Sequence, residues 1–188
     1  TLGSAYQSIN GSAGADTISV DSLTAVGTLS GGAGTDTLTL GNGANISGAT
    51  LSGFENLTLA NDANVSMKTM QIAGFTGTVT AAQNETLTLT DTGDISGATI
   101  NAFETIATGS DSTAQTITLT AAQADGTSLS AGDSGLDRFN VTGSAGGQNV
   151  TGSAAGDLID GGGGHDTLSG ADGDDTLSGA VSYTHLTL

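Results

Sequence analysis

Aspartate recurs at the sixth position of a nine-residue unit in the stretch GGGGHDTLSGADGDDTLSG, residues 161–179. With Gly161 at position one, Asp166 stands at position six, and Asp175 stands there in the next unit. Glycine permits positive φ and lets backbone carbonyls approach one another, so each turn offers an oxygen-rich cradle with one carboxylate. Calcium takes roughly six to eight oxygen ligands in flexible geometry. The residue types and their spacing therefore predict calcium binding.

The same period continues upstream and indicates the elements that position these turns. GSAAGDLID (152–160) places Asp157 at position six, and GSAGGQNVT (143–151) places Gln148 there. One aliphatic residue in every nine fits neither an amphipathic helix nor a free-standing hairpin. The aliphatic series is Val141, Val150, Ile159, Leu168 and Leu177. We expect short strands that stack and share an interior, so the predicted fold is all-β, a parallel β-roll or β-solenoid.

Residues 1–142 show a looser form of the same pattern. GSAGADTIS (11–19) and GGAGTDTLT (31–39) match the unit singly and carry Asp16 and Asp36. A longer repeat relates NISGATLSGFENL, from residue 45, to DISGATINAFETI, from residue 94, an offset of 49 residues. Alternating segments such as TLTLT (86–90) and TITLT (116–120) read as strands, and only residues 120–126 suggest a helical turn. We expect a Thr/Gly-rich solenoid region over 1–142 and a calcium-binding roll over 143–180.

The two ends of the chain depart from this pattern. VSYTHLTL, residues 181–188, breaks the period and resembles a translated sequencing-library adapter, so we expect a non-native tail there. Tyr183 and His185 within it accordingly receive no functional role. The chain begins TLGSAY, without Met or a signal peptide, and we expect the N-terminus of a longer protein to be missing.

Composition limits the partners of the chain. Two Lys and Arg residues stand against nineteen Asp and Glu, a formal net charge of −17. Such acidity disfavours nucleic acid and anionic membranes and favours cations. The chain has no Cys, so it has no disulfides, Cys-based zinc sites or thiol nucleophiles, and no apolar run approaches the length of a membrane span. His165 alone would make a poor zinc site, and we expect it to face solvent.

At the nine-residue units the chain resembles the RTX, or haemolysin-type, calcium-binding repeats of secreted bacterial proteins. The resemblance implies that two units complete one coil and that calcium lies between loops two units apart. It pairs Asp157 with Asp175, whereas Asp166 faces Gln148, whose uncharged amide predicts a weaker site, and its upper partner falls at Thr184. The implied backbone ligands are Gly152, Ala154, Gly161, Gly163, Gly170 and Asp172. Asp16 and Asp36 lie twenty residues apart and form a further site if the two extra residues bulge out.

The function that these features favour is a binding and structural module rather than an enzyme. The chain has no G-x-S-x-G or H-E-x-x-H motif, and Glu55 and Glu104 at matching places of the long repeat favour a structural role. The leading hypothesis is a calcium-stabilised module of a secreted or surface-displayed bacterial protein, adhesin-like or S-layer-like, with cell-surface or self-assembly partners. The alternative is the RTX region of a secreted protease or lipase. An ice-binding face of T-x-T segments is a third hypothesis, disfavoured by their irregular positions along the chain.

Overall fold

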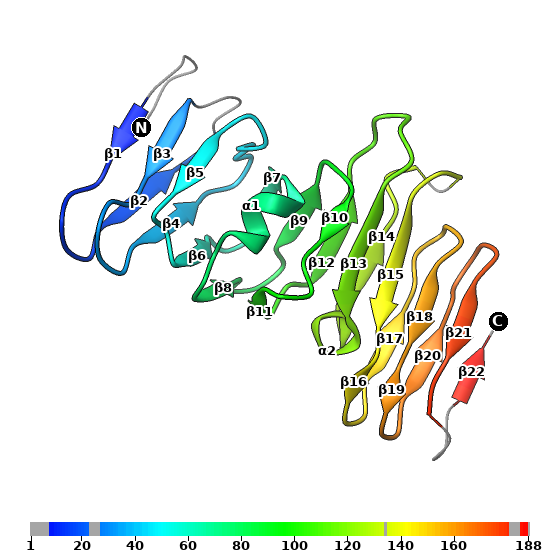
Figure 1. Cartoon of the computed structure of the whole chain (residues 1–188). Coiled ribbons are helices and arrows are strands. Elements are labelled where there is room, and N and C mark those ends of the chain that lie inside the picture. The colour runs from blue at the N-terminus through cyan, green and yellow to red at the C-terminus, as the bar shows by residue number, and fades with distance from the viewer. Residues whose placement is uncertain (1–7, 23–26, 134, 181–184, 188) are drawn as a thin grey trace. The chain divides into compact units, whose positions relative to one another are not determined.

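A computed structural model describes residues 8–22, 27–133, 135–180 and 185–187 (Figure 1). The chain forms two compact units, the first made of residues 1–90 and 97–103 and the second of residues 91–96 and 104–188. Each unit is a parallel β-solenoid, because every strand pairing within it is parallel and links strands that are not consecutive in the chain. The predicted all-β fold is confirmed. The region boundary expected at residue 143 from repeat regularity lies inside the second unit.

The first unit contains a five-stranded sheet, a three-stranded sheet and a strand pair. The five-stranded sheet has the order β11 (Thr99–Asn101), β8 (Thr78–Thr80), β6 (Asn56–Leu59), β4 (Thr37–Leu40) and β2 (Thr17–Val20). The other strands are β1 (Ser8–Asn10), β3 (Thr28–Ser30) and β5 (Thr50–Ser52) in one sheet, and β7 (Asn64–Met67) beside β9 (Thr86–Leu89).

The second unit is built in the same way. One sheet has the order β10 (Gly93–Asp94), β13 (Thr116–Thr120), β15 (Arg138–Thr142), β18 (Leu158–Asp160) and β21 (Thr176–Ser178). The facing strands are, in sheet order, β12 (Thr105–Thr108), β14 (Ser128–Ser130), β17 (Asn149–Thr151), β20 (Thr167–Ser169) and β22 (His185–Thr187). A short pair, β16 (Ser144–Ala145) and β19 (Gly162–Gly163), lies in the loops.

The register of the strands gives the length of each coil. In the region of regular units, Leu158 pairs with Thr176 and Asn149 with Thr167, a step of two nine-residue units. The expectation that two units complete one coil is therefore confirmed. Coils of the first unit are longer, since Asn64 pairs with Thr86.

Aliphatic side chains at alternate strand positions fill the interior. Val150, Ile159 and Leu168, at position eight of successive units, are all buried. Because side chains alternate between the two faces of a strand, the Thr and Ser residues between the aliphatic ones point outward. Leu38 and Leu57 form the same kind of interior column on neighbouring strands of the first unit. The fold thus places each turn at the end of an aliphatic column.

Outward threonines align across strands although they are irregularly spaced along the chain. Thr17 pairs with Thr37, and Thr39 pairs with Thr58, so some outward threonines lie in register on the five-stranded sheet. Differences in coil length are taken up in the turns and leave the strands aligned. Ser19 lies opposite Thr39 and Asn56 lies opposite Thr37, so the outward rows mix threonine with serine and asparagine.

Two short helices occupy turns of the longer coils. Helix α2 (Ala121–Ala124) lies where residues 120–126 predict a helical turn, whereas α1 (Thr69–Ala73) was not expected. Each helix anchors a glutamine on the SGAT turn of the long repeat. Gln71 Nε2 donates to the carbonyls of Ile46 (2.7 Å) and Ala49 (2.8 Å), and Gln123 Nε2 donates to that of Ile95 (2.8 Å). Neither helix, in the part of the chain that is described, is long enough to cross a membrane.

Part of the suspected tail forms a strand. Residues 185–187 form β22, which pairs in parallel with β20, His185 opposite Thr167. An edge strand presents unpaired N–H and C=O groups that accept many short extended segments, so backbone pairing explains this addition. Residues 181–184, which include Tyr183 and Thr184, lie outside the described residues.

Candidate metal centre

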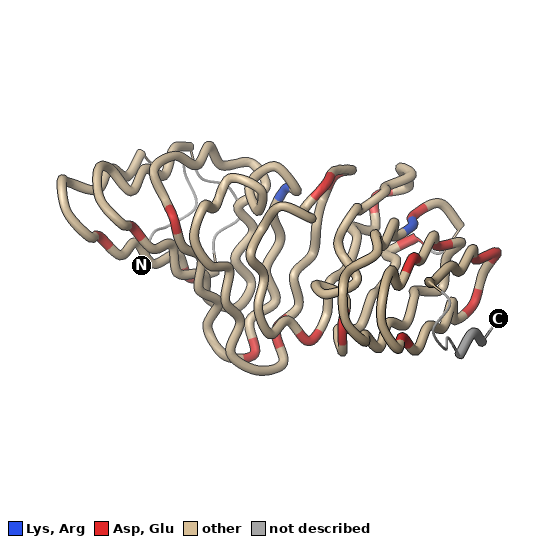
Figure 2. Tube along the Cα trace, turned by 60° about the horizontal axis from the view of Figure 1, so that its bottom comes forward, with Lys and Arg blue, Asp and Glu red and all other residues tan. Residues whose placement is uncertain are grey.

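Most acidic residues lie in the turns, and three of those at position six are buried. Among the described residues, only Asp94 and Asp160 of all the acids lie within strands, and Figure 2 shows the acids mostly at bends of the trace. The position-six side chains of Asp36, Asp157 and Asp166 are 0%, 2% and 3% exposed, respectively. Burial of so many carboxylates in a narrow solenoid requires that their oxygens be matched by donors or cations.

One carboxylate oxygen of each interior aspartate stacks on the coil before it. Asp157 N–H donates to Asp175 Oδ1 (2.9 Å), and Gln148 N–H donates to Asp166 Oδ1 (3.0 Å), each across 18 residues. The structure therefore brings together both pairs that the resemblance implies. Asp157 Oδ1 continues the series by accepting a hydrogen bond from Phe139 N–H (2.7 Å).

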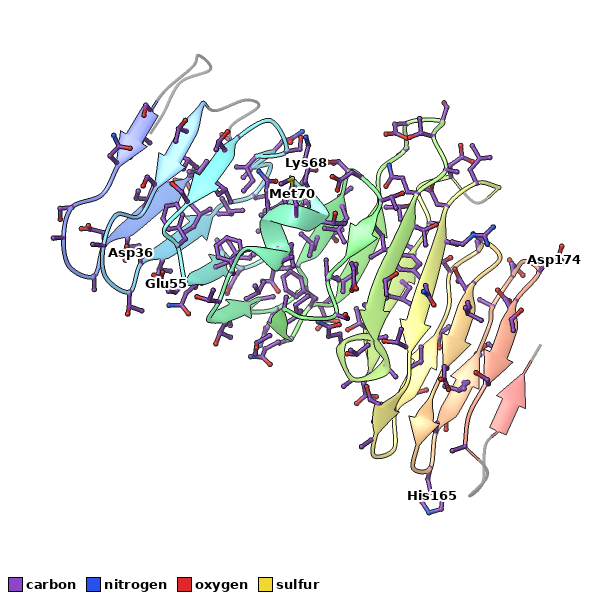
Figure 3. The ribbon with its side chains drawn as sticks, viewed as in Figure 1. Asp36, Glu55, Lys68, Met70, His165 and Asp174 are labelled. Atoms are coloured by element: carbon purple, nitrogen blue, oxygen red, sulfur yellow. The ribbon has the colours of Figure 1, made fainter. Side chains whose placement is uncertain are left out.

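The predicted pair in the first unit is also adjacent. Asp16 N–H donates to Asp36 Oδ1 (2.7 Å) across 20 residues, so the two extra residues are accommodated as expected. Asp36 N–H in turn donates to Glu55 Oε2 (2.7 Å), and Figure 3 shows Asp36 and Glu55 on neighbouring turns. The side chain of Glu55 thus joins the stack of loops, whereas that of Glu104, at the matching place of the long repeat, is exposed, and the carbonyl of Glu104 accepts from Ser128 N–H.

The second oxygens of these acids differ from loop to loop. Asp157 Oδ2 accepts from the backbone N–H (2.6 Å) and the hydroxyl (2.9 Å) of Ser153. Asp16 Oδ2 is held in the same way by Ser12. In contrast, Asp36 Oδ2 and Asp166 Oδ2 are buried and have no hydrogen-bond partner among the described residues.

Glycine at position one leaves room for the carboxylate of its own loop. A Cβ atom on Gly161 would lie 2.6 Å from Asp166 Oδ2, and one on Gly31 would lie 2.8 Å from Asp36 Oδ2. Gly164, at position four, has a φ of +131°, which non-glycine residues rarely adopt. Position one therefore requires glycine for space, whereas position four requires it for backbone conformation.

The predicted backbone ligands fall into two groups. Gly152, Gly161 and Gly170, at position one, are buried beside the carboxylates, whereas the position-three residues Ala154, Gly163 and Asp172 are exposed. Within the described residues no group of three or more His, Cys, Asp or Glu side chains is placed to hold a metal ion. A calcium site in these loops would therefore need carbonyl oxygens as well as carboxylates.

The stacked loops of Gln148 and Asp166 offer oxygen ligands that fit a hard cation. Gln148 Nε2 donates to Ala145 O (3.2 Å), which leaves its Oε1 directed elsewhere. In the described part of the chain, both Gln148 Oε1 and Asp166 Oδ2 are buried without a hydrogen-bond donor. Two buried oxygen acceptors without donors in one pair of stacked loops match the oxygen preference of calcium.

Sequence analysis missed two interior acids. Asp137 is 1% exposed, and its oxygens accept from Gln115 N–H (2.8 Å), Thr108 Oγ1 (2.6 Å) and Asp133 N–H (3.1 Å). Its stretch GDSGLDRFN (132–140) matches the nine-residue unit but stands out of phase with residues 143–180. Glu85 is 0% exposed and lacks any glycine pattern, so no sequence signal marks it.

The remaining charged residues of the regular units lie at the surface. His165 and Asp174 are exposed, as expected for variable loop positions, and both point away from the ribbon in Figure 3. Asp160, by contrast, is half-buried and accepts from Gly162 N–H (3.0 Å). These side chains do not take part in the interior stack.

Three stretches of the chain, residues 8–22, 28–46 and 142–179, match the RTX calcium-binding nonapeptide repeat in four copies. The matched stretches contain Asp16, Asp36 and the aspartates of the regular units, and leave out Glu55, Glu85 and Asp137. Comparisons with curated proteins and with solved structures give no match.

Proposed function

Since the chain carries RTX haemolysin-type calcium-binding nonapeptide repeats, we propose that it is a calcium-dependent structural and adhesive module of a secreted or surface-displayed bacterial protein. The carrying observation is the pair of buried oxygens, Asp166 Oδ2 and Gln148 Oε1, which lack donors among the described residues. The chain has only two Lys and Arg residues for nineteen acids, so its own cations cannot neutralise the turns. A bound divalent cation would offset both the charge and the missing donors.

The candidate calcium ligands are the aspartates at position six and the carbonyls of their loops. In the second unit these are Asp157, Asp166 and Asp175, and in the first unit Asp16 and Asp36, each one coil from its partner. Calcium supplies positive charge between stacked carboxylates that otherwise repel one another. The chain contributes the rest by fixing the carboxylates with backbone N–H groups and leaving space at the position-one glycines.

Folding after export follows from this arrangement. Where calcium is scarce, repulsion among carboxylates and the chain entropy of glycine favour the unfolded, exportable chain. Millimolar calcium outside the cell, against a Kd of about 10⁻⁴ M, would contribute roughly 1.4 kcal/mol per site. Several sites are therefore needed to order the array, which agrees with the repetition of the loops.

The outward faces of the sheets support an adhesive role rather than catalysis. Their outward positions carry Thr, Ser and Asn in rows that continue from strand to strand, such as Thr39 beside Thr58. Repeated polar groups on a regular surface suit contact with another repetitive surface. The chain has no G-x-S-x-G or H-E-x-x-H motif, which supports a non-catalytic role for this part.

The second candidate function is the RTX region of a secreted protease or lipase, which the same repeats favour. The reading frame that encodes the chain distinguishes the two, because a hydrolase would encode a G-x-S-x-G or H-E-x-x-H segment in another domain.

Far-UV circular dichroism of the chain in excess chelator and in millimolar calcium tests the proposed mechanism. We expect β-structure to increase on calcium addition and to be lost again on chelation, with magnesium at equal concentration as the control. An unchanged spectrum would contradict calcium-driven folding.

A further inference from the structure

We propose that the residue four positions before each interior acid decides whether that acid needs a cation. If this residue donates its backbone N–H to the acid, the carboxylate is satisfied by the protein. If the N–H points elsewhere, the second carboxylate oxygen is left for calcium. The inference rests on the proposed calcium binding. It assigns the need for calcium to the carboxylates of Asp36 and Asp166 rather than to that of Asp157.

The satisfied acids share one arrangement. Ser153, four residues before Asp157, donates its N–H and its hydroxyl to Asp157 Oδ2 at 2.6 and 2.9 Å. Asp133 N–H, four residues before Asp137, donates to Asp137 Oδ2 (3.1 Å). Both oxygens of Asp157 and both of Asp137 accept hydrogen bonds from the protein. These carboxylates are stabilised without an ion, because backbone donors replace the water lost on burial.

At the other two acids a glycine with positive φ occupies this position. Gly162, four residues before Asp166, has a φ of +79° and donates its N–H to Asp160 Oδ1 (3.0 Å). Gly32, four residues before Asp36, has a φ of +106°. Asp166 Oδ2 and Asp36 Oδ2 are the aspartate oxygens that are buried without a partner in the described parts of the chain.

Glu85 shows that the relation does not depend on the glycine loop itself. Ala81, four residues before Glu85, donates its N–H to the carbonyl of Asn101 (3.2 Å). Within the described residues, Glu85 Oε2 is buried and has no hydrogen-bond partner, although Gln83 N–H donates to Oε1 (2.7 Å). Because the N–H of Ala81 bonds elsewhere, Glu85 lacks a hydrogen-bond donor for one of its carboxylate oxygens. This happens in a coil that lies outside the matched repeats.

The hydrogen bonds reverse the order of sites that charge alone predicts. Charge counting places the pair of Gln148 and Asp166 below that of Asp157 and Asp175, because the amide carries no charge. However, a cation at Asp157 must compete with three donors already in place. At Asp166 the cation meets a buried oxygen without donors, and Gln148 Oε1 adds a second one within the described residues.

Two matched substitutions test the proposal in the full chain, Asp166→Asn and Asp157→Asn. Each removes one charge, so diffuse screening predicts equal effects. We expect Asp166→Asn to lose one bound calcium ion by isothermal titration, with an unfolding midpoint in chelator that is unchanged or higher. We expect Asp157→Asn to keep the number of bound ions and to lower the urea midpoint equally in chelator and in calcium, because an amide NH₂ would face the donors of Ser153.

A second pair in the first unit covers the case in which Asp157→Asn does not fold. Asp36→Asn should lose a calcium ion, whereas Asp16→Asn, whose Oδ2 is held by Ser12, should retain it. Equal loss of ions within both pairs would overturn the proposal and leave calcium binding intact. If the unaltered chain binds no calcium at all, the proposed function itself fails.

Discussion

The coils of residues 27–90 and those of residues 143–180 use the same parallel stacking but different means of stabilisation. The first set has steps of up to 22 residues, and its turns hold a helix, buried aromatic side chains such as Phe54 and Phe75, and a buried glutamine. The second set has 18-residue steps, turns of glycine and aspartate, and no Phe after Phe139. A coil with spare residues can therefore build an apolar turn, whereas a coil of minimal length relies on backbone donors and carboxylates.

Truncation of an interior aliphatic residue in the longer coils should have the largest effect on stability. Leu57 is fully buried on β6, and Leu57→Ala should cost about 3 kcal/mol because a cavity replaces the lost side-chain contacts. Urea unfolding in chelator and in calcium should give the same loss, since Leu57 lies within strand β6 and not in a turn that carries a candidate calcium ligand. Met70→Ala, at a side chain that is 71% exposed, is the control and should have little effect. If calcium restored the stability that Leu57→Ala loses, the stability of the longer coils would depend on calcium as well.

Removal of the buried glutamine should be the next largest effect. Gln71→Ala removes the side-chain donor from the carbonyls of Ile46 and Ala49, of which that of Ile46 still accepts from Ala49 N–H (2.8 Å). It also removes Gln71 Oε1, the acceptor for the N–H of Lys68 (2.7 Å). Unsatisfied buried backbone groups should cost about 2 kcal/mol in thermal unfolding. Gln123→Ala should cost less, because the side chain of Gln123 is only half-buried. Equal losses would mean that burial does not set the importance of these anchors.

A single glycine should stabilise the regular units. Ala171 has a φ of +71°, a left-handed conformation that is unfavourable for a residue with a Cβ. Ala171→Gly should therefore raise the free energy of unfolding by about 1 kcal/mol in calcium. Ala154→Gly, in the preceding loop on the same side, has no positive φ to relieve and should lower it by roughly 0.5 kcal/mol. If both substitutions destabilise, backbone strain at Ala171 is not a cost in the folded chain.

The smallest expected effect concerns acid stability at the long repeat. The hydroxyl and N–H of Ser96 hold the pKa of Asp94 below its ordinary value, so this turn gains stability above the unfolded pKa and loses it as pH falls through the folded pKa. Asn45 forms the same turn with Ser47 without a charge. Asp94→Asn should keep the fold and reduce the loss on acidification by roughly 0.5 kcal/mol or less, since the side chain is exposed. Thermal unfolding at neutral and acidic pH checks this, and an unchanged pH slope would contradict it.

The regular features of the fold were predictable because they follow from period. The spacing of nine predicted the interior position of Ile159, whereas the 18-residue step and the stacking of Asp157 on Asp175 were implied by the resemblance to RTX repeats. Helix α1 was not predictable, because the side chain of Gln71 bonds carbonyls 22 and 25 residues away in the sequence, and no local pattern reveals such partners. Nor was the difference between interior aspartates predictable. It depends on where one N–H points, and Ala171 shows that residue type alone does not fix that conformation.

The strand register also sets the size of the step by which such an array can change length. Because β18 pairs with β21 and β17 with β20, adjacent nonapeptides belong to opposite sheets. Loss of one nonapeptide would exchange the two sheets for every later strand, and would move every later aspartate to the opposite row of turns. Loss or gain of two would leave each strand beside an equivalent neighbour. Duplication and deletion are thus tolerated in whole coils, so the array should gain or lose nonapeptides in even numbers.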